Sequence, residues 1–156
     1  MTRSVTLNRY LQITMAMKTC VIAMDCWPNM PRDQIRQIRA LPADLHLSQH
    51  HDQPPHPLLP AWPQWQPPEL ERWIRAHRPC RLIYVGQHWD ACIAGRPTGM
   101  RTMSRFRPGC RIQVRPSLCR VMLDLATLRD REMTPGDLNS EWRQIDADLY
   151  QLPGEL

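Results

Sequence analysis

Residues 80–103 read CRLIYVGQHWDACIAGRPTGMRTM, and they decide the fold that we expect for the chain. They begin with the apolar run LIYV at residues 82–85, which Gly86 ends. A short apolar run next to a breaker is typical of a strand buried on both faces of a parallel sheet. A helical pattern then starts at Cys92, and its apolar positions are Ile93, Met100 and Met103. The stretch therefore predicts a strand, a short loop and a helix.

The predicted helix begins at a thiol. A helix N-terminus carries roughly half a positive charge and unpaired N–H groups, so a cysteine there tends to have a lowered pKa and more thiolate character. Open α/β sheets bind their ligands at the carboxyl ends of their strands. We therefore expect Cys92 to lie where such a fold would place a nucleophile.

Residues 86–93 (GQHWDACI) and 95–103 (GRPTGMRTM) resemble the cysteine-bearing strand–loop–helix of the isochorismatase-like cysteine hydrolases. That family keeps a glycine six residues before its nucleophilic cysteine, as Gly86 stands before Cys92. The resemblance is specific in this stretch and looser over most of the remaining chain. It implies one domain over residues 1–156, with a mostly parallel, Rossmann-like sheet in a three-layer α/β/α arrangement, shortened relative to the family.

The resemblance also implies a set of site residues. Residues 20–25 (CVIAMD) form an apolar run that ends on a carboxylate, as the first strand of the family does. By this resemblance Asp25 is the general base or acid that works with the nucleophile Cys92. The alternative is that Asp25 is a turn or cap residue before Pro28. The loop expected to hold the oxyanion and the substrate consists of His88, Trp89, Asp90 and Ala91.

Two departures from the family weaken the catalytic interpretation. The family uses a lysine beside its cysteine and aspartate, but no lysine follows Lys18 in this sequence. Arginine is a poor replacement because its guanidinium does not deprotonate and has a different shape. In addition, Asp90 places a negative charge two residues from Cys92, which would raise the pKa of the thiol. Trp89 could fill the substrate pocket.

A histidine-rich stretch follows the expected second strand at residues 44–48. Imidazole and carboxylate groups are common metal ligands, and one branch of the family binds a metal near this point. His50, Asp52 and His56 are the weak candidates for such a site. Their spacing differs from that of the family, so we favour a solvated polar turn and predict no metal and no cofactor.

The rest of the chain predicts further elements. We expect helices over residues 5–17, 33–41 and from 68 to 78, and a strand over 111–115. A proline- and tryptophan-rich connection at about 52–68 should pack on the sheet or on a partner. The segment 121–128 is ambiguous and is predicted to be helical. Thr134 and Pro135 resemble a helix start, and the apolar spacing of Leu138, Trp142, Ile145 and Leu149 predicts a last helix that docks on the sheet.

Composition limits the classes of protein and the partners. The six cysteines lack zinc-site spacing and favour an intracellular, reducing compartment, cytoplasmic or organellar. No apolar run is long enough to span a membrane. The first 24 residues contain no Asp or Glu, which is a weak feature of organelle-targeting segments; an ordinary first helix is the favoured interpretation. The net charge of +5 allows a nucleic-acid partner, but the positive charges are scattered along the sequence.

Together these observations favour a divergent isochorismatase-like protein with impaired catalysis. It would act as a structural or assembly subunit, with protein partners or as a homo-oligomer. The alternative is an active hydrolase of C–N or vinyl-ether bonds, and a plain nucleic-acid binder is the third hypothesis.

Overall fold

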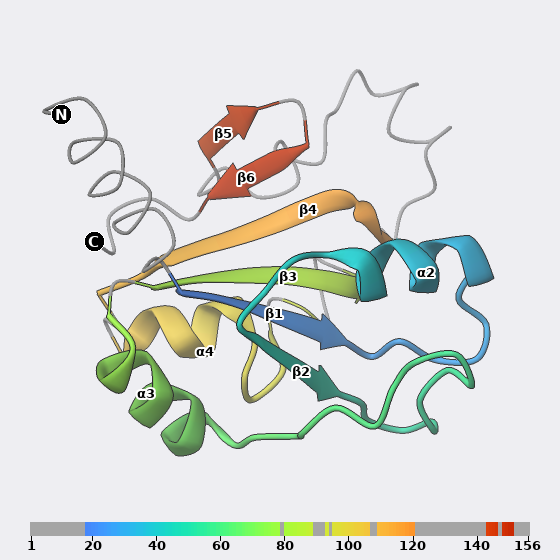
Figure 1. The fold of residues 1–156 in the computed structure, drawn as a ribbon, viewed down its shortest axis with the longest axis horizontal. Coiled ribbons are helices and arrows are strands. Elements are labelled where there is room, and N and C mark those ends of the chain that lie inside the picture. The colour runs from blue at the N-terminus through green and yellow to red at the C-terminus, as the bar shows by residue number, and fades with distance from the viewer. Residues whose placement is uncertain are drawn as a thin grey trace, which may run out of the picture.

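The computed structural model describes residues 18–78, 80–88, 93, 95–106, 109–120, 143–146 and 148–151. Their elements, in chain order, are β1 (Lys18–Met24), α2 (Arg32–Ala40), β2 (Leu45–Gln49), α3 (Pro67–Ala76), β3 (Cys80–His88), α4 (Met100–Arg105), β4 (Arg111–Arg120), β5 (Arg143–Asp146) and β6 (Leu149–Gln151). Figure 1 shows a twisted sheet with helices on both of its faces.

The strands form a six-stranded sheet in the order β2-β1-β3-β4-β6-β5. β1 pairs in parallel with β2 and with β3, and β3 pairs in parallel with β4. The hairpin of β5 and β6 is added in antiparallel orientation beside β4. The predicted α/β fold with a mostly parallel sheet is therefore confirmed.

Two apolar cores lie on opposite faces of the sheet, because alternate residues of a strand point to opposite faces. On one face, Leu70 and Ile74 of α3 and Met100 and Met103 of α4 pack against the strands. On the other face, the packing partners from α2 are Ile35 and Ile38, three residues apart on one side of the helix. The central strands are buried on both faces, which explains why β1 and β3 read as continuous apolar runs.

The proline- and tryptophan-rich connection packs on the sheet, as expected. The main chain N–H of Ser48 in β2 donates a 3.0 Å hydrogen bond to Pro63 O. The indole of Trp62 stacks on the ring of His46 with centroids 4.7 Å apart, and Trp65 packs against the apolar core. This segment therefore covers the β2 edge of the sheet, where unpaired strand groups would otherwise be exposed.

The helix predicted from Cys92 to Met103 is interrupted. Residues 93 and 95 are helical, residues 96–99 form a turn and bend, and α4 begins only at Met100. Pro97 has no N–H to contribute to a continuous helix. The carbonyl of Thr98 instead accepts a 2.5 Å hydrogen bond from the Tyr84 hydroxyl of β3. The break turns the chain back toward the ends of the strands.

The predicted last helix is wrong over residues 143–151, which form the β5–β6 hairpin. Leu149 is buried, whereas the Ile145 side chain is 47% exposed, so the expected inward stripe does not exist there. The predicted strand at 111–115 is also too short, because β4 continues to Arg120 through an irregular pairing with β3. The Ser117 N–H, within this extension, donates to Asp148 Oδ1 at 2.8 Å.

Two helix predictions, over residues 5–17 and 121–128, lie outside the described residues, as does the start of the last helix at residues 134–142. Within the described part of the chain, no helix has the length and apolar character that crossing a membrane requires.

Candidate functional site

Asp25 lies directly after β1, at the edge where the parallel strands end. Its side chain is fully buried, and its backbone adopts a left-handed conformation with φ of 50°. Aspartate tolerates this conformation better than most residues with a Cβ. The Asp25 N–H donates to Gln49 O at the end of β2 at 2.5 Å, and Asp25 O accepts from the Trp27 N–H at 2.9 Å. The carboxylate is thus fixed at the end of the first strand.

Two segments distant in sequence donate to this carboxylate. His51 donates to Oδ1 with its main-chain N–H at 2.8 Å, and its Nδ1 lies 3.0 Å from the same oxygen. Arg96 donates to Oδ2 with Nε at 3.0 Å. A second branch of the Arg96 guanidinium donates to Asp52 Oδ2 at 2.9 Å. We call these four residues the Asp25 cluster: Asp25, His51, Asp52 and Arg96.

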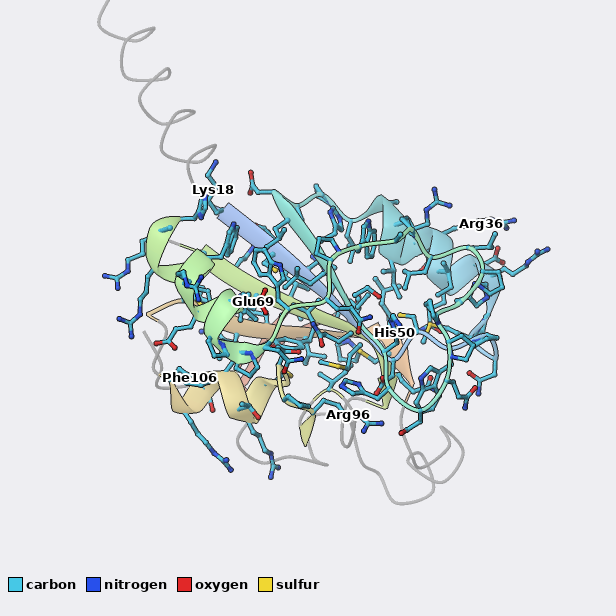
Figure 2. All side chains as sticks on the ribbon, turned by 90° about the horizontal axis from the view of Figure 1, so that it is seen from below. Lys18, Arg36, His50, Glu69, Arg96 and Phe106 are labelled. Carbon is cyan, nitrogen blue, oxygen red and sulfur yellow. The ribbon has the colours of Figure 1, made fainter. Side chains whose placement is uncertain are left out.

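The side chains of the Asp25 cluster range from fully buried to mostly exposed. The Asp25 side chain is fully buried, those of His51 and Arg96 are 28% and 27% exposed, and that of Asp52 is 70% exposed. Burial of a carboxylate is costly unless an opposite charge or several hydrogen bonds accompany it. Asp25 has both, because Arg96 is permanently charged and His51 contributes two donors. In Figure 2, Arg96 and His50 lie far from Lys18, which is the first residue of β1.

Gly86 explains how β1 and β3 approach each other so closely beneath this site. Its φ of 126° is a conformation that residues with a side chain rarely adopt, and a Cβ there would overlap the main chain of Met24. Gly86 also pairs with Met24 in the register of the two strands. The glycine thus brings the end of β3 against the residue that precedes Asp25.

Most of the predicted catalytic and substrate-loop residues lie outside the described part of the chain. Cys92, Trp89, Asp90 and Ala91 lie outside the described residues, and His88 is described only as the last residue of β3. The carboxyl ends of β1 and β3 meet at the same edge, since the two strands are parallel neighbours.

Sequence analysis missed Arg96. The residue belongs to the stretch that carried the family resemblance, but nothing in its spacing assigned it to Asp25, which lies 71 residues away in sequence. No lysine follows Lys18 in the sequence, so no lysine from that part of the chain can pair with the carboxylate. In the structure Arg96 provides a cation, and it comes from the turn that interrupts the predicted helix.

The three weak metal candidates face different partners. The Nε2 atom of His50 lies 3.0 Å from Gln64 Nε2, Asp52 binds Arg96, and His56 Nδ1 accepts from the Leu58 N–H at 3.0 Å. Within the described residues, no group of three or more His, Cys, Asp or Glu side chains is arranged to hold a metal ion.

The described cysteines are unsuited to nucleophilic chemistry in most positions. Burial raises the pKa of the Cys26 thiol to about 12, and the neighbouring Asp25 carboxylate adds to this effect. Burial also raises the pKa of Cys20 and of Cys119. Cys80 is different, because a hydrogen bond from the Cys110 thiol, opposed in part by burial, lowers its pKa. A raised pKa keeps a thiol protonated and weakly reactive at neutral pH.

The chain was compared with protein-family models, with curated protein sequences and with solved structures, and no significant match was found in any of the three. The functional argument therefore depends on the Asp25 cluster and on the sheet edge that holds it.

Proposed function

We propose that the chain is a divergent isochorismatase-like protein with impaired hydrolase chemistry, which serves as a structural or assembly subunit of a larger complex. The observation that carries this proposal is the ion pair between Arg96 Nε and Asp25 Oδ2, at 3.0 Å. In the chemistry that the family resemblance implies, the aspartate takes a proton from the cysteine. Here the corresponding carboxylate already binds three donors.

Both oxygens of the Asp25 carboxylate already accept hydrogen bonds from other segments of the fold. Oδ1 accepts two hydrogen bonds from His51, and Oδ2 accepts one from Arg96. Hydrogen bonds to charged groups each contribute about 1.5–3 kcal/mol, so these contacts favour a structural role for the carboxylate. Arg96 also cannot relay a proton as a lysine can. We infer that the Asp25 cluster joins three segments of the fold rather than activating a thiol.

Surface features support a role in assembly. Phe106 is 38% exposed and Ile145 is 47% exposed, and both are large hydrophobic side chains. The net charge of +5 comes almost entirely from arginine. Aromatic residues and arginine are enriched in protein–protein interfaces, so these features favour a protein partner or a second copy of the chain.

The alternative function is an active hydrolase that cleaves a C–N (amide) or vinyl-ether bond through a Cys92 thiolate. The burial and fixed orientation of Asp25 at the end of β1 favour this alternative. For an amide, Asp25 would take the thiol proton, the thiolate would attack the carbonyl carbon, and the amine would leave with that proton. Water would then hydrolyse the thioester and regenerate the thiol.

Alkylation of Cys92 separates the two functions. The folded protein would be treated with iodoacetamide at neutral pH, and modification of each cysteine would be followed by peptide mass mapping. We expect Cys92 to react no faster in the wild-type protein than in the Asp25→Asn variant. Rapid labelling in the wild type that Asp25→Asn abolishes would overturn the proposal and establish an activated thiol.

Two further variants make this test specific. Arg96→Gln removes the cation, and we expect it to raise the labelling rate of Cys92 by freeing Oδ2 of Asp25. Arg101→Gln is the matched control, since Arg101 is exposed on α4 and the same charge is removed. Circular dichroism of each variant would show that differences in rate do not reflect unfolding. Equal rates in Arg96→Gln and Arg101→Gln would contradict the role assigned to Arg96.

A further inference from the structure

Three arginines gather on one face of the sheet, away from the Asp25 cluster. Arg81 of β3 and Arg111 of β4 are register partners on adjacent parallel strands. Arg115 lies four residues along β4 from Arg111 and therefore points to the same face. We call Arg81, Arg111 and Arg115 the arginine face.

The arginine face belongs to the side of the sheet that α2 covers only in part. Ile83 and Val85 of β3 share this side and pack in the apolar cluster with α2. α2 lies over the carboxyl-terminal half of the central strands (Figure 1). Arg81 and Arg111 stand near the start of their strands, beyond that cluster.

Within the described part of the chain, the positive charges of this face have few acidic partners. Arg115 Nη1 lies 4.0 Å from Asp148 Oδ2, and among the described residues neither Arg81 nor Arg111 forms an ion pair with a carboxylate. Arg81 Nε donates to the neutral Thr19 hydroxyl at 3.2 Å. Like charges on neighbouring strands destabilise the sheet, so an external anion would relieve the repulsion.

Further observations point to an absent ligand. Burial lowers the pKa of Arg81, and the charges of Arg115 and Arg111 lower it further, which places the three guanidinium groups within each other's field. Arg115 Nε is buried and has no hydrogen-bond partner among the described atoms.

The arginine face extends along the strands. Four residues of strand separate the Cα atoms of Arg111 and Arg115 by about 13 Å, so the two side chains can contact successive phosphates of one nucleic-acid strand. Nucleic-acid strands carry a phosphate every ~3.4 Å of helix axis, and the planar fork of arginine matches phosphate oxygens. We propose that the arginine face binds the phosphate backbone of a nucleic acid.

This proposal goes beyond the assembly role and does not depend on the reactivity of Cys92. Fluorescence anisotropy of a short labelled single-stranded RNA, and of DNA of the same sequence, would measure affinity at salt concentrations between about 50 and 200 mM. We expect log Kd to rise linearly with log salt. Arg111→Gln should lower this slope by about 0.7–0.9 and weaken binding roughly tenfold at the low end of salt.

Variants and competitors decide the outcome. Arg111 is exposed, so its substitution should leave folding intact, and Arg81→Gln gives an independent loss from β3. Arg105→Gln is the matched control, because Arg105 is exposed on α4, which packs on the opposite side of the sheet. An equal loss in Arg105→Gln, or no salt-dependent binding, would overturn the proposal. Competition by polyglutamate as effective as that by RNA would assign the face to an acidic protein, and full competition by inorganic phosphate would assign it to a single anion; both outcomes would also overturn the proposal.

Discussion

Substitution of Asp25 by asparagine should destabilise the fold through loss of the charge and of the hydrogen bond from Arg96, with little change in shape. Asparagine has nearly the same shape as aspartate and also tolerates the left-handed backbone at this position. The amide oxygen can still accept from His51, but an amide NH₂ in the place of Oδ2 would face the Arg96 guanidinium. Two N–H donors, one from the asparagine amide and one from Arg96, would then face each other where the 3.0 Å hydrogen bond now lies.

The expected magnitude follows from the burial of the two partners. Removal of one member of a buried ion pair costs about 3–5 kcal/mol. Arg96 is 27% exposed and keeps its bond to Asp52, so solvent and the second carboxylate reduce this loss. We expect the free energy of unfolding to fall by about 2–3 kcal/mol. With a urea dependence of about 1–3 kcal/mol per molar, the urea midpoint should fall by roughly 0.7–3 M.

A double-mutant cycle tests the reasoning more strictly. Urea unfolding of Asp25→Asn, Arg96→Gln and the double variant should give a coupling energy of about 1–2 kcal/mol. The matched control is the Asp33–Arg36 pair on α2, whose side chains are 85% and 63% exposed. Its coupling should be below about 0.5 kcal/mol. A coupling energy for Asp25 and Arg96 no larger than that of the control pair would refute the proposal that the Asp25 cluster stabilises the fold by joining three of its segments.

Three further changes have defined outcomes. Gly86→Ala should lower the free energy of unfolding by more than about 3 kcal/mol or prevent folding, because the added methyl group overlaps the β1 main chain and the backbone at Gly86 has a positive φ. Gly95→Ala is the control: its added methyl group meets open space, so thermal or urea unfolding should be nearly unchanged. The pKa of the Cys26 thiol is raised in the folded state from 9.0 to about 12, so its contribution to stability is complete below pH 9 and is lost as the pH rises toward 12. The free energy of unfolding should then fall by up to about 1.4 kcal/mol per pH unit, and Cys26→Ala should reduce this fall. An unchanged dependence of the unfolding free energy on pH in Cys26→Ala would refute the raised pKa of Cys26. Leu149→Ala should cost about 2–4 kcal/mol and Ile145→Thr less than about 1 kcal/mol in the free energy of unfolding. A cost as large for Ile145→Thr as for Leu149→Ala would contradict the hairpin and favour the helix predicted for this segment.

The parallel sheet could be predicted from the sequence because its signals are local. β1 and β3 are buried on both faces, so their apolar runs are visible without knowledge of their neighbours. The prolines around Trp62 and Trp65 likewise indicated an irregular segment, and its tryptophans indicated packing. The β5–β6 hairpin could not be found in this way, because the four-residue spacing of Ile145 and Leu149 also fits a helix. Pairing with β4 decides between the two structures.

The candidate site was only half accessible to sequence reasoning. Asp25 was found because it ends an apolar strand, which is a local feature. Arg96 was missed because its contact with Asp25 arises from the parallel pairing of β1 and β3 and from the break at Pro97. His51 was noticed only as part of a histidine-rich stretch, and its partner proved to be a carboxylate 26 residues earlier in the chain.

The size of the particle that contains the native protein tests the assembly role most directly. The tagged chain would be expressed at its natural level, and a lysate at physiological salt would be fractionated by sedimentation. We predict that the chain sediments in a particle much larger than its own 18.3 kDa and purifies with stoichiometric partners. A free 18.3 kDa monomer that turns over an amide or vinyl-ether substrate, with loss of activity in Cys92→Ala, would contradict the account.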